Sequence, residues 1–243
     1  MEAKPSVTPV PVLNDNYVWL IHDAESGETA AVDPSVGPPV LQAARKLGTP
    51  ITQVLNTHWH PDHTGGNDSI RDAVACPVTG PAEAEKVSRL DRVVAGGDEV
   101  AVGRWMARVW DIPAHTAGHI AFYFEEAGMI FVGDTLFAMG CGRLFEGTAA
   151  QMFDNLQRMA ALPEETLVYC GHEYTLANAR FAIAVEPNNE AVQRRLRQAE
   201  QARAEGIATL PTTIGEERAT NPFMRAADVE EFARLRRMKD SFG

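Results

Sequence analysis

The chain has 243 residues, of which 45% are hydrophobic and 23% charged, as in a globular protein of one large domain or of one domain with a small appendage. Its net charge of −11 would repel a nucleic-acid backbone, and no apolar run approaches the ~18 residues of a membrane span, so we expect neither as a partner. Prolines interrupt the N-terminal segment where a signal peptide needs a continuous apolar stretch, and the three cysteines form no close pair, so we expect a cytoplasmic protein with free, buried thiols.

Strand-like segments dominate the chain up to about residue 172. They are short apolar runs broken by turn residues, and they lie at 17–21, 29–32, 51–57, 119–124, 128–133 and 166–171. A helix is expected over 38–48, because proline begins that segment and glycine ends it. Another begins at Thr148, which has Gln151 three residues later in a capping-box arrangement. The pattern predicts an α/β sandwich of sheets flanked by helices.

The pattern changes after residue 172. Strand-like runs largely vanish, and two charged helical segments follow, one ending at Gly206 and one opened by Asp228. The net charge changes at the same place, since residues 1–172 have a net charge of −11 and the charges of residues 173–243 cancel to zero. We therefore predict a catalytic domain over 1–172 and a small helical domain over 173–243.

The stretch "NTHWHPDHTGG" (56–66) carries the strongest chemical signal. Side chains two residues apart on an extended segment point the same way, so His58 and His60 can bind one ion. Asp62 and His63 follow Pro61 at the start of an expected helix and would face a slightly different point, which implies two metal positions. A lone histidine is more often a packed residue than a ligand, but this density reverses that expectation. His22 is interpreted as a structural residue, and His119 either as a core residue or as one that supports a metal ligand.

Further candidate ligands follow later apolar runs: His115, Asp134 and His172. Loops on a rigid scaffold would deliver them to one rim of a sheet. The number of candidate ligands then allows two sites. His58, His60 and His115 would form one, and Asp62, His63 and His172 would form the second. Asp134 has two carboxylate oxygens and can bridge both ions. Imidazole and carboxylate ligands suit Zn²⁺ best, with iron or manganese as alternatives.

These motifs resemble the metallo-β-lactamase superfamily and, within it, the glyoxalase II family. The resemblance covers essentially the whole chain, through "NDNYVWLI", "AAVDPS", "NTHWHPDHTGG", "PAHTAGHI", "FVGDTLFAMGCGRLFEG", "YCGHEYT", "NPFMR" and "RRMKD". It implies a four-layer αββα sandwich with a dinuclear site at one edge, a helical domain over the substrate and the same seven metal ligands. It also implies that glutathione is held by Arg143, Tyr174, Arg236 and Lys239.

Two positions depart from the family pattern. Position 143 is usually lysine, and Arg143 keeps the charge with a different geometry. Position 145 is often tyrosine, and Phe145 lacks the hydroxyl, which should cost about 0.5–1.5 kcal/mol of binding.

The resemblance implies hydrolysis of S-D-lactoylglutathione and related thioesters by a monomeric, metal-dependent enzyme of methylglyoxal detoxification. Two metal ions would lower the pKa of a water molecule, Asp62 would orient it and accept its proton, and Asp134 would bridge the ions. A glutathione-persulfide sulfur dioxygenase with a single iron is the alternative. A nuclease would need a basic surface, and a metal-binding module without catalysis would have no reason to carry the "RxxKD" helix.

Overall fold

The computed structural model describes residues 4–242, and the chain divides into two compact units. The first unit comprises Met1–Asp111 and Gly118–Gly133. The second comprises Ile112–Ala117 and Asp134–Gly243.

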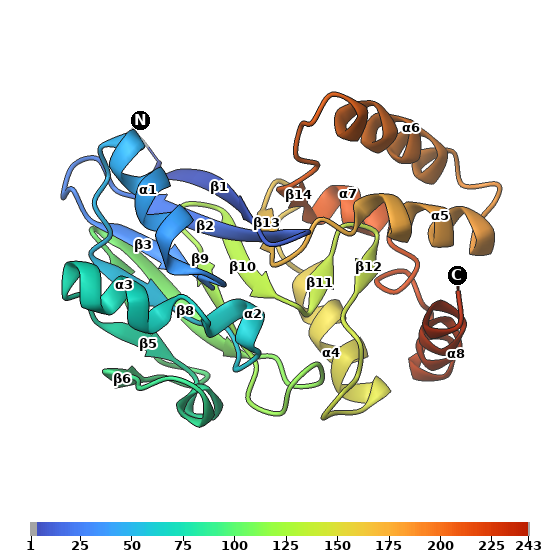
Figure 1. Cartoon of the computed structure of the whole chain (residues 1–243). Coiled ribbons are helices and arrows are strands. Elements are labelled where there is room, and N and C mark those ends of the chain that lie inside the picture. The colour runs from blue at the N-terminus through green and yellow to red at the C-terminus, as the bar shows by residue number, and fades with distance from the viewer. Residues whose placement is uncertain (1–3, 243) are drawn as a thin grey trace. The chain divides into compact units, whose positions relative to one another are not determined.

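A mixed sheet forms one half of the first unit (Figure 1). Its strands lie side by side in chain order: β1 (Ser6–Val12), β2 (Asn16–His22), β3 (Thr29–Val32), β4 (Gln53–Leu55), β5 (Val78–Gly80) and β6 (Arg92–Val93). The first three strands are antiparallel, and β3 to β6 are parallel. Parallel neighbours require crossover connections, which are supplied here by α1 (Gly37–Leu47) and α3 (Asn67–Val74).

Strand β1 was not among the expected strands, because Pro9 and Pro11 interrupt its sequence. Both prolines lie opposite residues of β2, at Trp19 and Tyr17. Proline has no backbone N–H to donate to a ladder, but β1 is at the edge of the sheet and pairs only with β2, so fewer of its N–H groups need a partner in the sheet. The edge position explains why a proline-rich segment is extended here.

A second, antiparallel set of strands completes the first unit: β7 (Glu99–Val102), β8 (Trp105–Asp111), β9 (Ile120–Phe124) and β10 (Met129–Gly133). Strands β9 and β10 are buried throughout, whereas β8 alternates between buried and exposed residues. The amide of Gln53 on β4 donates 2.9 Å to the backbone oxygen of Ala101 on β7, which links the two sheets.

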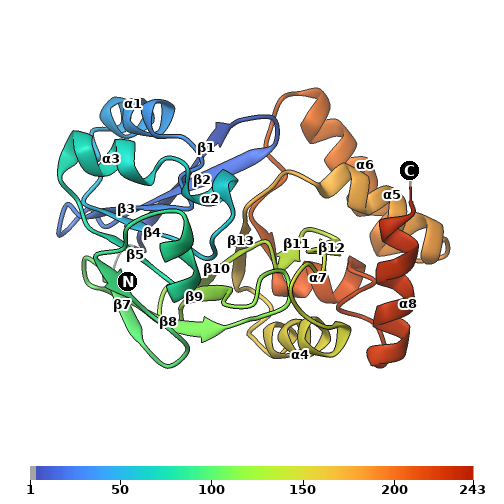
Figure 2. The ribbon, with the colours of Figure 1, turned by 60° about the horizontal axis from the view of Figure 1, so that its bottom comes forward.

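Helices α1 and α3 lie side by side against the first sheet (Figures 1 and 2). Their apolar residues Val40, Ala44 and Ile70 join Leu20 and Val54 of the sheet in one core. Burying a side chain of this size stabilises the folded state by about 1.5–3 kcal/mol. Helix α1 confirms the expected helix, with prolines in its first turn and Gly48 (φ 73°) as a left-handed cap.

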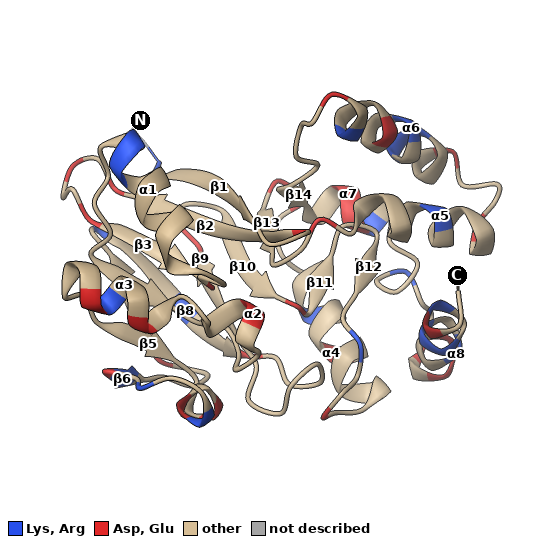
Figure 3. Cartoon of the chain, viewed as in Figure 1, with Lys and Arg blue, Asp and Glu red and all other residues tan. Residues whose placement is uncertain are grey.

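The second unit contains the remaining elements: β11 (Leu136–Phe137), β12 (Gly140–Cys141), α4 (Ala149–Ala160), β13 (Leu167–Cys170), α5 (Thr175–Val185), α6 (Glu190–Ala204), β14 (Thr212–Thr213), α7 (Ile214–Thr220) and α8 (Val229–Asp240). Thr148 and Gln151 form the expected capping box of α4, and Asp228 caps α8. Helix α5 packs on α6, and Ala182 of α5 and Val192 of α6 share one buried cluster with Met139. Acidic and basic residues are frequent along α6 and α8 (Figure 3).

Among the helices of the described chain, none combines the length and the apolar character needed to cross a bilayer. The cysteines Cys76, Cys141 and Cys170 are free and buried, as expected from the sequence.

Candidate metal centre

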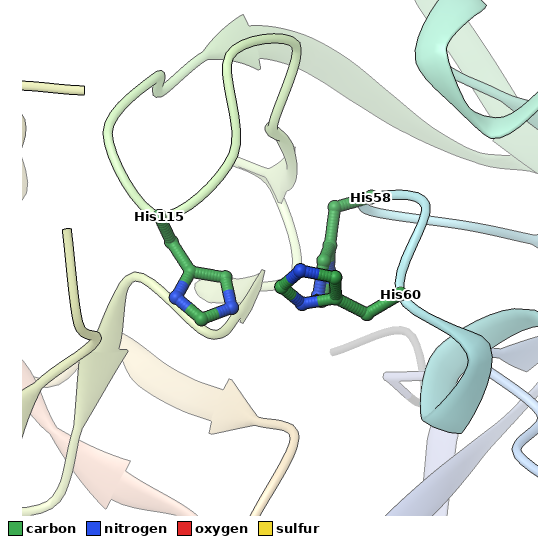
Figure 4. A group of neighbouring side chains, drawn as sticks. All are labelled: His58, His60 and His115. Atoms are coloured by element: carbon green, nitrogen blue, oxygen red, sulfur yellow. The ribbon is translucent and has the colours of Figure 1, made fainter. Parts of the chain in front are cut away.

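The histidines of the "NTHWHPDH" segment follow the end of a short parallel strand. Strand β4 ends at Leu55, two residues before the limit that the sequence predicts, so His58 and His60 lie on the loop that follows it. Nε2 of His58 and Nδ1 of His60 are 3.1 Å apart. The two imidazoles therefore face each other, and their role as metal ligands stays a prediction. Figure 4 shows that the side chains of His58 and His60 extend from the same short segment and that the side chain of His115 extends from a separate loop.

Asp62 and His63 lie on the single-turn helix α2 (Pro61–Thr64). Proline at the first position suits this turn, because its missing N–H would have no helical partner there. Oδ2 of Asp62 is 3.7 Å from Nε2 of His63. The His63 side chain is 1% exposed and that of Asp62 is 41% exposed. The first unit therefore holds two pairs of potential ligands on one short segment.

Asp33 organises this segment from the end of β3. Its Oδ1 accepts the backbone N–H of Thr57, and its Oδ2 accepts the Thr57 hydroxyl, both at 2.7 Å. The same Oδ2 lies 3.2 Å from Nδ1 of His63. Asp33, His58 and His63 also place one ligand atom each within 4.8 Å of one another. Since both oxygens of Asp33 already accept protein hydrogen bonds, its carboxylate orients the ligands around it.

Asp33 is not among the ligands predicted from the sequence, although a signal for it exists. Like Asp134, it is an acidic residue directly after a buried apolar strand. His119 is expected to be a core residue or one that supports a ligand, and its surroundings fit both descriptions. It is fully buried, and its ring stacks on that of His58 with centroids 4.5 Å apart and planes 13° apart.

In the second unit, Asp134 lies between two imidazoles. Its Oδ2 is 3.5 Å from Nε2 of His115 and 3.3 Å from Nε2 of His172. All three side chains are less than a tenth exposed. Nδ1 of His115 lies 3.0 Å from the backbone oxygen of Arg143, so an Nδ1–H donated to that oxygen leaves Nε2 directed at Asp134. This is the arrangement expected of a carboxylate that two metal-bound histidines share.

Gly142 allows the backbone to pass close to this carboxylate residue. A β-carbon at position 142 would stand 1.9 Å from the backbone oxygen of Asp134 and 3.1 Å from Nδ1 of His115. Any side chain there would displace the backbone that carries Asp134. Glycine at this position is therefore a steric requirement of the site.

The residues assigned to glutathione by the resemblance all belong to the second unit. Arg143 is exposed, and the ring of Tyr174 stacks on that of His172 with centroids 4.7 Å apart and planes 3° apart. Arg236 is only 6% exposed, donates 2.8 Å to the backbone oxygen of Cys141 and pairs with Asp240 at 2.8 Å.

Lys239 is partly buried and donates to the backbone oxygen of Ala177. Burial, with a smaller contribution from the positive charges of Arg236 and Arg143, lowers the pKa of Lys239 below its usual value. The charges of Arg236 and Arg143 thus act on Lys239 within this unit. Phe145, which replaces the expected tyrosine, is 59% exposed beside the ring of His115.

The donor chemistry fits divalent metal ions. A tetrahedral ion with nitrogen or oxygen ligands at about 2.0–2.1 Å holds its ligand atoms about 3.3–3.4 Å apart. Within each unit, imidazole and carboxylate atoms face each other at 3.1–3.7 Å. Mostly buried imidazoles and carboxylates at these separations are the ligands that zinc, iron and manganese share.

Comparison with known proteins identifies the family. Residues 13–172 match the model of the metallo-β-lactamase superfamily, and residues 173–242 match the model described as the hydroxyacylglutathione hydrolase C-terminus. The hydroxyacylglutathione hydrolase of Methylococcus capsulatus is 48% identical, over 97% of this chain and 98% of the relative. That of Rhodospirillum rubrum is also 48% identical, over 96% of this chain and 97% of the relative.

Among solved structures, ETHE1 from Myxococcus xanthus superposes with a TM-score of 0.74 and 28% identity, covering 96% of this chain and 90% of that protein. The predicted fold class is confirmed, since the chain has the metallo-β-lactamase fold, an α/β sandwich, followed by a helical C-terminal region. With that fold, the His/Asp clusters indicate a dinuclear metal site. The chain belongs to the hydroxyacylglutathione hydrolase family of the metallo-β-lactamase superfamily, as its motifs predict.

Proposed function

We propose that this protein hydrolyses S-D-lactoylglutathione and related 2-hydroxyacylglutathiones to the hydroxy acid and glutathione, the second step of methylglyoxal detoxification. The observation that carries the proposal is the extent of the match to hydroxyacylglutathione hydrolases. It runs through the segments that hold the histidines and Arg143 and continues through residues 173–242, the part of the chain that carries Arg236 and Lys239. A match confined to the metal motif would have supported the fold but no substrate.

The proposed centre has seven ligands. His58, His60 and His115 would hold one ion, Asp62, His63 and His172 a second, and Asp134 would bridge them. The contacts of Asp134 with His115 and His172 support its bridging role. Two Zn²⁺ ions suit this ligand set best, and iron or manganese is compatible with it. We also propose that residues 1–172 act as the catalytic domain and residues 173–243 as the substrate domain.

The side chains divide the chemical work. When bound, two divalent ions lower the pKa of water and neutralise negative charge that develops on the thioester oxygen. Asp62 would orient the attacking water and accept its proton, and Asp134 would bind both ions. The leaving thiol has an ordinary pKa of about 8.5, so it departs as a thiolate without a dedicated general acid.

Glutathione is an anion, and the negative net charge of the chain requires local cations to receive it. Arg143 and Lys239 are the accessible candidates, with Tyr174 beside them. Arg236 contributes charge from a buried position, since its guanidinium is bonded to Cys141 and Asp240. Binding of the glutathione carboxylates by these groups would rest on charge more than on shape, because exposed lysine and arginine side chains are flexible.

The alternative, a glutathione-persulfide sulfur dioxygenase with a single iron, has less support. Relatives that match nearly the full length at 48% identity are named hydroxyacylglutathione hydrolases. The second-site candidates Asp62 and His63, together with His172, are all present, whereas one iron would not need them. We also propose that the protein is a monomer and that it acts in the cytoplasm.

Hydrolysis of S-D-lactoylglutathione by the purified protein tests the function, with metals counted on the same sample. The expected result is thioester hydrolysis with two metal ions per chain and no oxygen uptake. One iron per chain with oxygen uptake on glutathione persulfide would establish the alternative. Hydrolysis with fewer than two ions per chain would refute the dinuclear centre but would still support the proposed substrate.

A further inference from the structure

We propose that Asn16 is a positioning residue that fixes the carboxylate of Asp62, and thereby the second metal site. The proposal rests on the proposed function, in which Asp62 is a metal ligand. Asn16 is the first residue of β2 and lies 46 residues away from Asp62 in the chain. Its side-chain nitrogen donates to the backbone oxygen of Asp62 at 3.1 Å and to Oδ2 of Asp62 at 3.3 Å.

The two contacts use both hydrogens of one amide group. An asparagine Nδ2 carries two N–H donors, and here each has an acceptor on the same residue. Asn16 is itself 5% exposed and paired in register with Val12, so its backbone is held by the β1–β2 hairpin. A rigid strand therefore holds both the backbone and the carboxylate of Asp62.

Asp62 needs an external support of this kind. It lies on a helix of a single turn, and its side chain is 41% exposed, so packing restricts its rotamers little. Oδ2, the oxygen that Asn16 contacts, is also the one that lies 3.7 Å from Nε2 of His63. The amide thus retains this oxygen on the side of the helix that faces the other ligand.

Ser35 offers an internal comparison. Its hydroxyl donates to the backbone oxygen of Asp62, the acceptor that Asn16 also uses, but no described contact joins it to the carboxylate. Loss of Ser35 removes support from the α2 backbone, whereas loss of Asn16 also releases the ligand oxygen. Residues that orient metal ligands typically contribute 10–100-fold to metal affinity.

The test is a double-mutant cycle in the full-length metal-loaded enzyme, with metal affinity measured by competition against a chromophoric chelator. Asn16→Ala is expected to weaken the more weakly held ion 10–100-fold and to lower kcat while KM for S-D-lactoylglutathione changes less than about twofold. In an Asp62→Ala background, the same substitution should change metal affinity less than about threefold. Where Asp62→Ala holds only one ion, the effect of Asn16→Ala on the affinity for that ion is compared between the two backgrounds.

Matched variants separate positioning from general stability. Asn16→Asp preserves shape but removes both donors and faces Oδ2 with a second carboxylate, so it should weaken the metal more than Asn16→Ala. Ser35→Ala should have a smaller effect than either. Asn14→Ala, at an exposed position of the same hairpin, should leave metal affinity unchanged.

Equal effects of Asn16→Ala and Asn14→Ala, or an Asn16→Ala effect that persists undiminished in the Asp62→Ala background, would overturn the proposal. The same cycle separates it from the proposed function. Coupling of Asn16 to Asp62 without hydrolysis of glutathione thioesters would refute the function and retain the positioning role. Hydrolysis without coupling would refute the positioning role alone.

Discussion

Oδ2 of Asp33 lies 3.2 Å from Nδ1 of His63, and the contact fixes which nitrogen of the imidazole faces away from the carboxylate. An Nδ1–H donated to Asp33 leaves the lone pair on Nε2, the atom that lies near Asp62. The same carboxylate accepts the backbone N–H and the hydroxyl of Thr57, the residue before His58. Asp33 therefore sets the orientation of the histidine segment from a neighbouring strand.

Asp33→Asn should weaken metal binding 10–100-fold, because the amide cannot accept hydrogen bonds on both of its ends. The buried N–H or hydroxyl of Thr57 would lose its acceptor, at a cost of about 1–3 kcal/mol in the free energy of unfolding. Metal affinity by chelator competition and urea unfolding of the metal-free protein measure the two effects separately. Unchanged metal affinity in a folded variant would show that Asp33 supports the loop alone.

Asp134→Ala should reduce the metal content from two ions to one or none, because the variant loses the only carboxylate that contacts both His115 and His172 among the described contacts. Activity should fall at least about 100-fold, the size expected when one electrostatic stabiliser of the transition state is removed. Metal content by mass spectrometry and the hydrolysis rate check this prediction. Asp154→Ala, an exposed acidic residue of α4, is the control. Two ions with full activity in Asp134→Ala would contradict the bridging role.

The elements that were predicted from sequence are those whose signal is local. Strands β2, β3, β9 and β10 are continuous apolar runs because they are buried on both faces, and α1 carries its own proline start and glycine stop. Strand β8 has no such run, because every second side chain faces away from the core. Local patterns therefore located the centre of the sandwich better than its edges.

The roles that sequence could not assign depend on contacts between distant residues. Helical periodicity places Arg236 and Lys239 on one face but does not say how deep each lies. In the structure, the guanidinium of Arg236 is buried against Cys141, 95 residues away. The link from Asn16 to Asp62 is of the same kind, since nothing near either residue in the sequence indicates the other.

The difference in burial between the two cations of α8 predicts different consequences of their loss. Lys239→Ala should raise KM for glutathione thioesters about tenfold and leave KM for a small neutral thioester unchanged, since a charge contact to the substrate is worth on the order of 1 kcal/mol or more. Arg236→Ala should also lower the free energy of unfolding by about 1–3 kcal/mol, because it leaves the Cys141 carbonyl without this donor.

Steady-state kinetics on both substrates and urea unfolding distinguish the two variants. Arg237→Ala, at an exposed position of the same helix, is the matched control. Equal losses on both thioesters in Lys239→Ala would count against a contact with glutathione.

Glu217 predicts a pH dependence of stability that is independent of the metal ligands. Its side chain is fully buried on α7, and burial raises its pKa to about 7, although Thr212, Asn221 and the N–H of Met139 donate to it. The pKa is above the ordinary value of 4.5 that the unfolded chain shows. The folded state therefore binds more protons than the unfolded state between pH 4.5 and 7. The stability contributed by protonation is complete below pH 4.5 and is lost as pH rises through 7, by at most about 3 kcal/mol.

Glu217→Gln removes the titrating group at nearly constant shape, so the variant should lose this part of the pH dependence. Its free energy of unfolding, relative to that of the unsubstituted protein, should be higher at pH 8 than at pH 5. All four tryptophans lie within residues 1–111, outside the unit that contains Glu217, so unfolding is followed by far-ultraviolet circular dichroism. Glu216→Gln, at a partly exposed neighbour whose charge makes the smallest contribution to the raised pKa of Glu217, should retain most of the pH dependence of the unsubstituted protein. Parallel pH profiles for Glu217→Gln and the unsubstituted protein would show that Glu217 is ionised throughout this range.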